Sequence, residues 1–292
     1  MDQFVLPTPG GARVAVREFA PATAARGSVV LGGAMGVPQT YYAPFAQWLA
    51  AQGWRVTTFD YRGHGDSLAL GPPLRTLKAD LNDWARDYEA VVAYARAAAI
   101  DGPLYLIGHS LGAQLPGMFA QPERVDGLLA VATGVGYWRH NAAATRRRAP
   151  LLWWLLVPVV TPLAGYFPGR RLGVVGDLPA GVIQQWRRWC LHPEYSVGVE
   201  GPAVRASYAS VAFPIRAFAV ADDEMLTAES MQGLLRLYTG APHLVQRIEP
   251  QAVGLKRIGH LGWFRAASQA ALWPLLAQAL NDLPRPATRA HA

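Results

Sequence analysis

The sequence predicts an α/β fold, in which a mostly parallel central sheet carries helices on both faces and a helical cap is inserted into the chain. Three observations support this prediction. Short apolar runs alternate with segments of helical periodicity along most of the 292 residues, which is typical of a parallel sheet covered on both faces. The apolar run at 103–109 enters a glycine-framed turn, and a helix is expected at 111–120. Between 137 and 210 the strand signals stop and Trp, Arg and Pro become frequent, which indicates an insertion.

The first half of the chain supplies four strands and two helices before that turn. Residues 13–19 alternate polar and apolar side chains, as an antiparallel strand at the edge of a sheet would. Residues 28–31 are a short apolar strand that ends in the glycine-rich loop 32–36. We then expect a helix at 39–52, a strand at 55–61 that ends in a tight loop at 62–67, a long helix at 77–99 and the strand at 103–109.

The second half resumes the same alternation after the insertion. The remaining expected elements are a strand at 125–133, a strand at 215–221, a helix at 228–238, a strand at 243–249 and a closing helix at 261–281. These assignments predict a core domain formed by residues 1–136 and 211–283, a cap at 137–210 and a flexible tail at 284–292.

The turn at Gly108-His109-Ser110-Leu111-Gly112 is the most informative part of the chain. A buried strand precedes it and a helix is expected after it, so Ser110 lies at the apex of a strand–turn–helix unit. This arrangement is typical of a nucleophile elbow, which exposes a serine hydroxyl at the end of a sheet. The two glycines remove side chains that would collide where such a turn closes. We therefore predict that Ser110 is a nucleophile.

Composition excludes several other classes of protein. With 51% hydrophobic and 16% charged residues the chain is too apolar for disorder. The single cysteine, Cys190, excludes an internal disulfide and a cysteine-rich metal site. The net charge of +7 comes from scattered arginines without a nucleic-acid-binding motif, so no nucleic acid partner is expected. The N-terminal residues do not resemble a signal peptide, and we expect a cytoplasmic protein.

An uncharged apolar stretch occupies residues 151–167 inside the insertion. It is shorter than the roughly 20 apolar residues that a membrane span needs, and Pro158 and Pro162 interrupt it. We interpret it as helical segments that cover an apolar region, and the preceding Arg146-Arg147-Arg148 as a solvated turn.

The motifs together resemble those of the α/β-hydrolase superfamily along nearly the whole chain. The resemblance rests on the loop at 32–36, the loop at 59–67 (Phe-Asp-Tyr-Arg-Gly-His-Gly-Asp-Ser), the elbow at 108–112, Asp223 and Gly259-His260. The loop at 59–67 is similar to that of the monoacylglycerol-lipase and serine-aminopeptidase-like branch. The insertion, with its stretches at 165–169 and 186–190, resembles a poorly characterised bacterial group of α/β-hydrolases. This similarity implies an α/β-hydrolase fold and a serine hydrolase mechanism, without a metal or cofactor.

The resemblance also assigns the partners of the serine. The superfamily orders its triad as Ser, acid and His along the chain, and here His260 is the histidine that follows an acidic loop and stands in a glycine-flanked loop before a helix. Two acids compete for the second place. The superfamily's Asp-x-apolar-apolar pattern favours Asp223 over Asp222, and the other acid is expected to cap a helix or to bind the loop.

The oxyanion hole requires two backbone N–H groups. Leu111, directly after the nucleophile, should supply one, and the loop at 32–36 should supply the other from Met35. This loop departs from the superfamily, because Gly33-Ala34 replaces the usual His-Gly before the oxyanion residue.

The cap is expected to contact the substrate. Five of the ten tryptophans fall within it, and we predict substrate contacts from Trp138, Trp153 and Trp186, and from His64 and His109 in the core. An acyl-binding tunnel with a basic rim would suit an anionic ester or peripheral contact with an anionic membrane. Simple packing of the cap against the core explains the same composition equally well.

The predicted function is therefore hydrolysis of carboxylic esters, with a small-molecule acyl ester of short-to-medium chain length or a monoacylglycerol-like compound as substrate. A thioesterase, an amidase or an acyltransferase would use the same three residues. A non-catalytic lipid-binding protein is the alternative from another class. The sequence gives no basis for predicting the oligomeric state.

Overall fold

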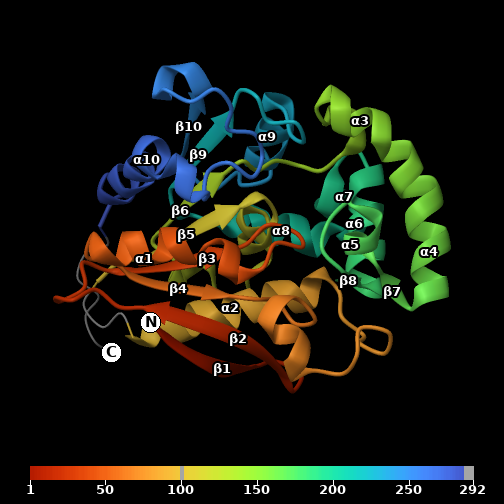
Figure 1. Cartoon of the computed structure of the whole chain (residues 1–292), viewed down its shortest axis with the longest axis horizontal. Helices are drawn as coiled ribbons and strands as arrows, with labels where there is room; N and C mark the ends of the chain where they lie inside the picture. The colour runs from red at the N-terminus through yellow and green to blue at the C-terminus, as the bar shows by residue number, and fades with distance from the viewer. Residues whose placement is uncertain (99–101, 286–292) are drawn as a thin grey trace.

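The computed structural model describes residues 1–98 and 102–285. The fold is built on an eight-stranded sheet with helices on both faces (Figure 1). The strand order is β1-β2-β4-β3-β5-β6-β9-β10, and all pairs from β4 to β10 are parallel while β1 and β2 are antiparallel to their neighbours. The strands are β1 (Asp2–Thr8), β2 (Ala12–Phe19), β3 (Ser28–Gly32), β4 (Arg55–Phe59), β5 (Leu104–His109), β6 (Gly127–Val131), β9 (Ile215–Val220) and β10 (His243–Ile248). The predicted α/β fold with a mostly parallel sheet is confirmed.

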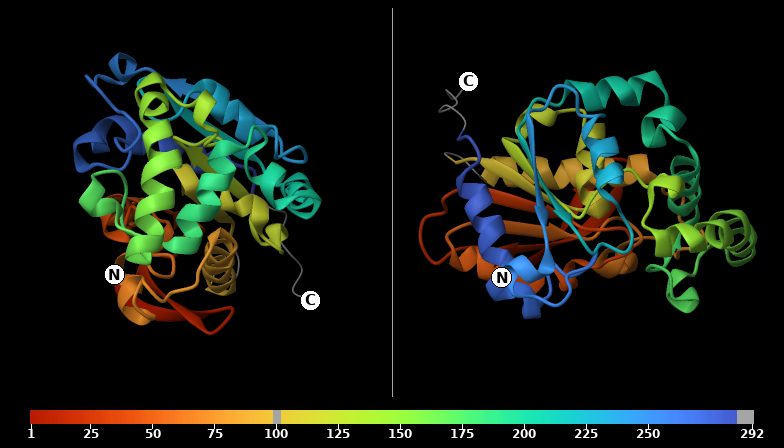
Figure 2. Two further views of the ribbon diagram at one scale, coloured as in Figure 1. Left: turned by 90° about the vertical axis from the view of Figure 1, so that its right-hand side faces the viewer. Right: turned by 90° about the horizontal axis from the view of Figure 1, so that it is seen from above.

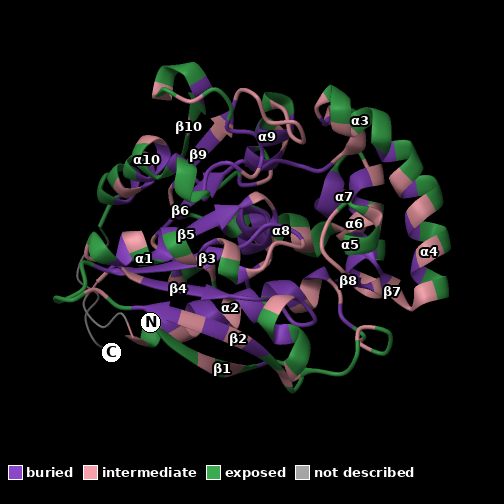
Figure 3. Cartoon of the chain, in the orientation of Figure 1, coloured by how far each residue is buried: buried purple, intermediate pink, exposed green. Residues whose placement is uncertain are grey.

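Successive side chains of the central strands enter two separate apolar cores. On β3, Val30 packs with α2 (Leu81–Ala98) on one face, whereas Val29 and Leu31 pack with α1 (Ala43–Ala51) and α10 (Gln269–Asn281) on the other. This division follows from the two-residue period of a strand. Both faces are covered, so the strands are apolar throughout, and Figure 3 shows them buried along their length.

Residues 137–210, which the sequence predicts to be an insertion and which we call the inserted segment, are mainly helical, and most of their helices lie at one side of the sheet (Figures 1 and 2). It contains α3 (Ala143–Pro150), a π-helical turn (Leu151–Leu156), α4 (Val157–Ala164), α5 (Gly169–Leu172), α6 (Ala180–Leu191), α7 (Tyr195–Glu200), α8 (Pro202–Ser210) and the short strands β7 (Tyr166–Phe167) and β8 (Leu178–Pro179). α9 (Ala228–Leu235) follows β9. The three arginines that the sequence suggested as a solvated turn lie instead in α3.

The N-terminal strand β1 is absent from the sequence predictions. β1 contains Pro7, and an edge strand tolerates proline because one row of its backbone groups needs no partner. β1 pairs with β2 from Asp2↔Glu18 to Thr8↔Ala12. β2 is therefore not the edge strand that its alternation suggested.

The helices differ from their predicted bounds, among them α1, which begins at Ala43 instead of residue 39, and α9, which ends at Leu235 instead of residue 238. The long helix begins at Leu81 instead of residue 77, and the closing helix begins at Gln269 instead of residue 261. The segment after the elbow forms two 3₁₀ turns, Ser110–Ala113 and Leu115–Met118, in place of a continuous helix over 111–120. Pro116 lacks the N–H that an α-helix would use there. Residue 99 of the predicted long helix and residues 286–292 of the predicted tail lie outside the described residues.

Candidate active site

Ser110 stands at the end of β5 in a backbone conformation that few L-residues adopt. Its φ is +53°, and it begins the first 3₁₀ turn. The turn is closed tightly: a Cβ on Gly112 would lie 2.0 Å from the carbonyl oxygen of Gly32, which belongs to the neighbouring strand. The Thr133 hydroxyl, after β6, donates to the carbonyl of Ser110 at 2.7 Å. The apex of the turn is thus fixed from both neighbouring strands, as the persistence of a strained backbone conformation requires.

His260 and Asp223 form a buried pair at the same side of the sheet. His260 Nδ1 lies 2.9 Å from Asp223 Oδ2, and each side chain is 3% exposed. The other carboxylate oxygen, Oδ1, accepts from the amides of Met225 and Leu226 at 2.7 and 2.9 Å. Both oxygens are therefore occupied, which fixes the carboxylate and, through it, the orientation of the imidazole.

The two acids beside Asp223 hold the backbone of the histidine loop. Asp222 accepts hydrogen bonds from the amides of Ile258 and Gly259, both at 3.0 Å. Glu224 accepts one from the amide of His260 at 3.1 Å. Three consecutive carboxylates thus bind one three-residue stretch, 258–260, and the structure brings Asp223, not Asp222, to the imidazole. Asp222 binds the loop, one of the two roles that the sequence left open for it.

His109 is buried behind the elbow and connects it to the other loops of the site. Its Nε2 lies 3.0 Å from the carbonyl oxygen of His260, so Nε2 carries the proton. Nδ1 must then accept from the hydroxyl of Tyr42, 2.9 Å away, and the same hydroxyl oxygen accepts from the amide of Ala34 at 2.8 Å. One chain of hydrogen bonds therefore joins the loop after β3, the elbow and the histidine loop.

The environment keeps His109 neutral. Burial, with a smaller contribution from neighbouring His260, lowers the pKa of His109 to about 3. Its ring is fully buried. This position differs from the substrate contact that the sequence suggested, because no surface of the ring is free to touch a ligand.

The geometry of the loop at 32–36 bears on the oxyanion hole. The amide of Ala34 already donates to the hydroxyl of Tyr42. The next amide along the chain, that of Met35, is the one that the sequence predicts as an oxyanion donor. Leu111 lies in the first turn of the 3₁₀ segment, where amides have no partner within the helix. Both side chains are buried, at 7% and 2% exposure, so each residue is held in place by packing.

His64 lies in the tight loop after β4 and is 3% exposed. Burial lowers the pKa of His64 to about 4. Its ring lies beside Trp84 of α2, with ring centroids 6.5 Å apart. The side chain is neutral and enclosed at pH 7, which leaves little of its surface for the substrate contact that the sequence predicts.

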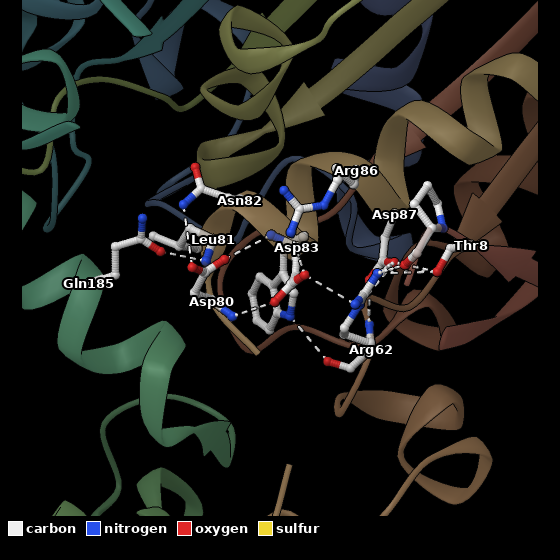
Figure 4. Close-up of polar contacts among 11 residues, drawn as sticks. Thr8, Arg62, Asp80, Leu81, Asn82, Asp83, Arg86, Asp87 and Gln185 are labelled. Atoms are coloured by element: carbon white, nitrogen blue, oxygen red, sulfur yellow. Dashed lines mark hydrogen bonds and ion pairs between the residues drawn. The ribbon is translucent and has the colours of Figure 1, made fainter. Parts of the chain in front are cut away.

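The same loop is anchored by a buried charge cluster around Arg62 (Figure 4). The guanidinium binds Asp87 at 2.6 Å and Asp83 at 3.2 Å, both on α2, while Thr8 of β1 donates to Asp87 at 2.7 Å. On the other side of the loop, burial raises the pKa of Asp60 to about 6, although its carboxylate accepts from two backbone amides. These contacts fix the loop without touching the Asp223–His260 pair.

The tryptophans predicted to contact substrate lie in the inserted segment and in contact with other rings. Trp153 is 3% exposed and meets Trp186 edge-on, with centroids 5.2 Å apart. Trp186 donates to the hydroxyl of Tyr195 at 3.2 Å. Trp138 is half-buried and meets Trp154 edge-on at 5.5 Å. The contacts of Trp153 fit packing within the segment, one of the two explanations that the composition left open.

The start of the inserted segment is bound to the loop that carries Asp223. Ala142 donates its amide to the carbonyl of Met225 at 3.0 Å, and the Thr145 hydroxyl donates to the carbonyl of Glu224 at 2.7 Å. Farther along, Gly176 lies so close to Gly36 that a Cβ on either residue would meet the other's backbone at 2.5–2.6 Å. The segment therefore lies over the loops after β3 and β9.

Two residues that matter here have no signal in the sequence. Tyr42 binds the elbow through His109, and Gln114 binds the inserted segment: Tyr195 donates to its Oε1 at 3.0 Å, and its Nε2 donates to the carbonyl of Gly134 at 2.8 Å. Both residues act through long-range contacts between segments of ordinary composition, so only a three-dimensional structure reveals their roles.

Within residues 1–98 and 102–285, no group of three or more His, Cys, Asp or Glu side chains is placed to hold a metal ion. In the same part of the chain, no helix is both long enough and apolar enough to cross a membrane. An open groove of about 610 Å³ runs between the loop 75–80 and the inserted segment, and none of its lining residues belongs to the site around Ser110.

The sequence of the chain is similar to known hydrolases. Residues 23–166 match the profile of the family described as "Serine aminopeptidase, S33". A monoacylglycerol lipase of Mycolicibacterium smegmatis is 32% identical over 118 residues, which are 40% of this chain and 40% of that protein. The chain thus matches less than half the length of this curated relative.

Solved structures resemble the whole chain. A soluble variant of monoglyceride lipase from Saccharomyces cerevisiae, in complex with a substrate analogue, matches with a TM-score of 0.67 and 14% identity, over 100% of this chain and 97% of that one. A thermostable carboxyl esterase from Bacillus coagulans matches with a TM-score of 0.66 and 12% identity, over 97% and 98% of the two chains. At these identities the likeness concerns the fold.

Proposed function

We propose that the chain is a serine hydrolase of the α/β-hydrolase superfamily that cleaves carboxylic esters, since residues 23–166 match the serine aminopeptidase family and the whole fold resembles that of a monoglyceride lipase. The observation that carries this proposal is the buried Asp223–His260 pair, whose loop is bonded through His109 to the turn that presents Ser110. A serine at a strained apex needs a base, and the base needs an orienting carboxylate. These three residues supply the three roles.

In the proposed reaction Ser110 is the nucleophile. Its Oγ attacks the ester carbonyl while Nε2 of His260 takes the hydroxyl proton, and Asp223 stabilises the imidazolium through Nδ1. Collapse of the tetrahedral intermediate breaks the ester bond, and the alcohol leaves with the proton from His260. Water then attacks the acyl-enzyme, His260 accepts the proton of this water, and the carboxylic acid is released as Ser110 recovers its proton.

The amides of Met35 and Leu111 would stabilise the negative charge on the tetrahedral oxygen. Their support is the hydrogen-bonded chain through Tyr42, which occupies the amide of Ala34 and leaves the following one for the substrate. A single oxyanion donor contributes about 10²–10³ in turnover. We infer that the packing of Met35 and Leu111 keeps these two amides preorganised.

We propose further that residues 137–210 form a cap over this site and that their apolar side chains receive the acyl chain. The support is the set of contacts from this segment to the loops of Met225, Glu224 and Gly36. Of the predicted aromatic contacts, Trp138 and Trp186 keep exposed surface and are the better candidates to touch a ligand. Short-to-medium acyl or monoacylglycerol-like esters would suit such a cap.

A p-nitrophenyl ester series from acetate to palmitate tests the proposal, with Ser110→Ala as the control. Wild type should hydrolyse the short and medium esters, and the variant should lose turnover to background. A parallel series of acyl thioesters and anilides separates a thioesterase or an amidase from an esterase. Retention of turnover in Ser110→Ala, or binding of fatty acid without any hydrolysis by wild type, would overturn the proposal.

A further inference from the structure

The outermost part of the inserted segment is one continuous helical rod. α3, the π-helical turn and α4 follow one another without a break from Ala143 to Ala164. At about 1.5 Å per residue the rod is roughly 33 Å long. It lies at the edge of the molecule in Figure 1 and faces the viewer in the left panel of Figure 2.

One line of side chains attaches the rod to the protein. Ala149, Trp153, Val157 and Thr161 follow one another at four-residue spacing, and all four are buried. This spacing defines one face of a helix. The contact of Trp153 with Trp186 of α6 belongs to this inner face.

The opposite face of the rod is also apolar, although it is open to solvent. We call it the outer stripe: Leu151 (55% exposed), Trp154 (50%), Leu155 (53%), Val159 (46%) and Leu163 (81%). The exposed Pro158 and Pro162 lie on the same face, so its members recur at spacings of three and four residues. A surface helix normally carries polar side chains there, and a contiguous exposed apolar patch marks an interaction site. Figure 3 shows this exposure along α4.

Positive side chains precede and follow the outer stripe along the chain. Arg146, Arg147 and Arg148 are exposed on α3, and Arg170 and Arg171 are exposed just beyond β7. The sequence from 127 to 176 contains no Asp or Glu. The formal charges within this stretch of the chain are therefore of one sign only.

We propose that the outer stripe docks on the surface of an anionic lipid bilayer. Helices that lie in the membrane interface combine a strip of Leu and Trp with basic side chains that bind anionic headgroups. The rod is convex, so a flat surface suits it better as a partner than a peptide, which would need a groove. A second copy of the chain fits less well, because a symmetric contact through this stripe would bring together two segments whose charges are all positive.

This inference does not depend on the proposed ester hydrolysis, because binding to lipid is measured without turnover. Vesicle co-sedimentation of the full chain compares phosphatidylcholine alone with phosphatidylcholine containing 30 mol% phosphatidylserine. Vesicles with phosphatidylserine should retain the protein, and about 0.5 M salt should weaken the binding because charge attraction is screened. Equal binding to both vesicles, or none to either, would overturn the proposal.

Two sets of variants locate the contact. Leu155→Gln with Leu163→Gln should lower the vesicle partition coefficient at least about tenfold, because it removes two apolar side chains from the interface. Leu244→Gln is the matched control, since Leu244 is 60% exposed on β10, away from the rod, and its loss should leave binding unchanged. An equal effect of the Leu244 control, or a change of the stripe variant from dimer to monomer in sedimentation velocity, would contradict a lipid partner.

Replacing Arg146, Arg147 and Arg148 by Gln tests the charged end of the rod. At roughly a fivefold effect per basic residue near an anionic surface, the triple variant should bind phosphatidylserine vesicles about a hundredfold more weakly. Circular dichroism should show a folded protein, because these side chains are exposed on α3. Unchanged binding by this folded variant would exclude the charge contribution that the proposal requires.

Discussion

Tyr42→Phe tests how the site is held together. The hydroxyl of Tyr42 accepts from the amide of Ala34 at 2.8 Å and donates to Nδ1 of His109 at 2.9 Å. Tyr42 is 1% exposed and His109 is fully buried, so water has little access to either partner. Removal of one oxygen atom thus leaves two buried polar groups without their partner.

The expected cost follows from these two groups. A buried polar group that loses its partner costs about 1–3 kcal/mol, so two cost about 2–6 kcal/mol, and we expect the free energy of unfolding to fall by about 3 kcal/mol. The loop of Met35 and the carbonyl of His260 both lose part of their support. Misplacement of about 1 Å in a catalytic group costs about a hundredfold, so kcat should fall by about ten- to a hundredfold while KM changes little.

Urea unfolding monitored by circular dichroism gives the stability, and p-nitrophenyl butyrate hydrolysis gives kcat and KM. Tyr105→Phe is the matched control: it also removes a buried tyrosine hydroxyl, but one that donates to the carbonyl of Pro284, 3.0 Å away, outside the site. The control should keep wild-type kcat and lose about 1 kcal/mol. If Tyr42→Phe were as stable and as active as wild type, the hydroxyl would not be the bridge that we describe.

Three further predictions concern the acids, the elbow and pH. Asp223→Asn should lower kcat by about 10³–10⁴-fold, whereas Asp222→Asn should keep most of kcat and lose about 1–2 kcal/mol of stability in urea unfolding; the reverse ranking would reassign the acid. Gly112→Ala should cost about 3 kcal/mol or more, because its Cβ would lie 2.0 Å from a backbone oxygen, and Gly71→Ala, with open space around its Cβ, should change the melting temperature little. Burial lowers the pKa of His64 to about 4 and that of His109 to about 3. As pH falls, the unfolded chain therefore binds protons at these histidines before the folded chain does, and stability should fall as pH drops from 6.5 towards 4. The raised pKa of Asp60, about 6, acts in the opposite direction below pH 6 and leaves a net uptake of about one proton on unfolding; urea titrations at stepwise pH would contradict this if stability stayed constant.

The strands and the elbow could be predicted because their signals are local. Val29, Val30 and Leu31 are apolar on both faces, as a central strand requires. The glycines at 108 and 112 predict a tight turn, because a Cβ at either position would collide with backbone atoms. β1 could not be predicted, because an edge strand forms through pairing with its neighbour and its own composition carries little signal. The helix expected after the elbow is replaced by 3₁₀ turns, because Pro116 lacks the N–H that a continuous helix would use.

Side-chain directions were harder to predict than positions along the chain. The sequence placed His109 next to the nucleophile, but only the fold shows that its ring points into the protein toward Tyr42 and the His260 carbonyl. His64 was likewise placed in the correct loop without its burial. The assignment of Asp223 stays a prediction for catalysis, although its contact with His260 is what the register suggested.

Labelling with a fluorophosphonate probe tests most directly whether Ser110 is an activated nucleophile. We expect the wild-type chain to form one covalent adduct, mapped by tandem mass spectrometry to Ser110, and we expect Ser110→Ala and His260→Gln to remain unlabelled. A folded wild-type protein that takes up no probe, or one whose adduct maps to a different residue, would contradict the account.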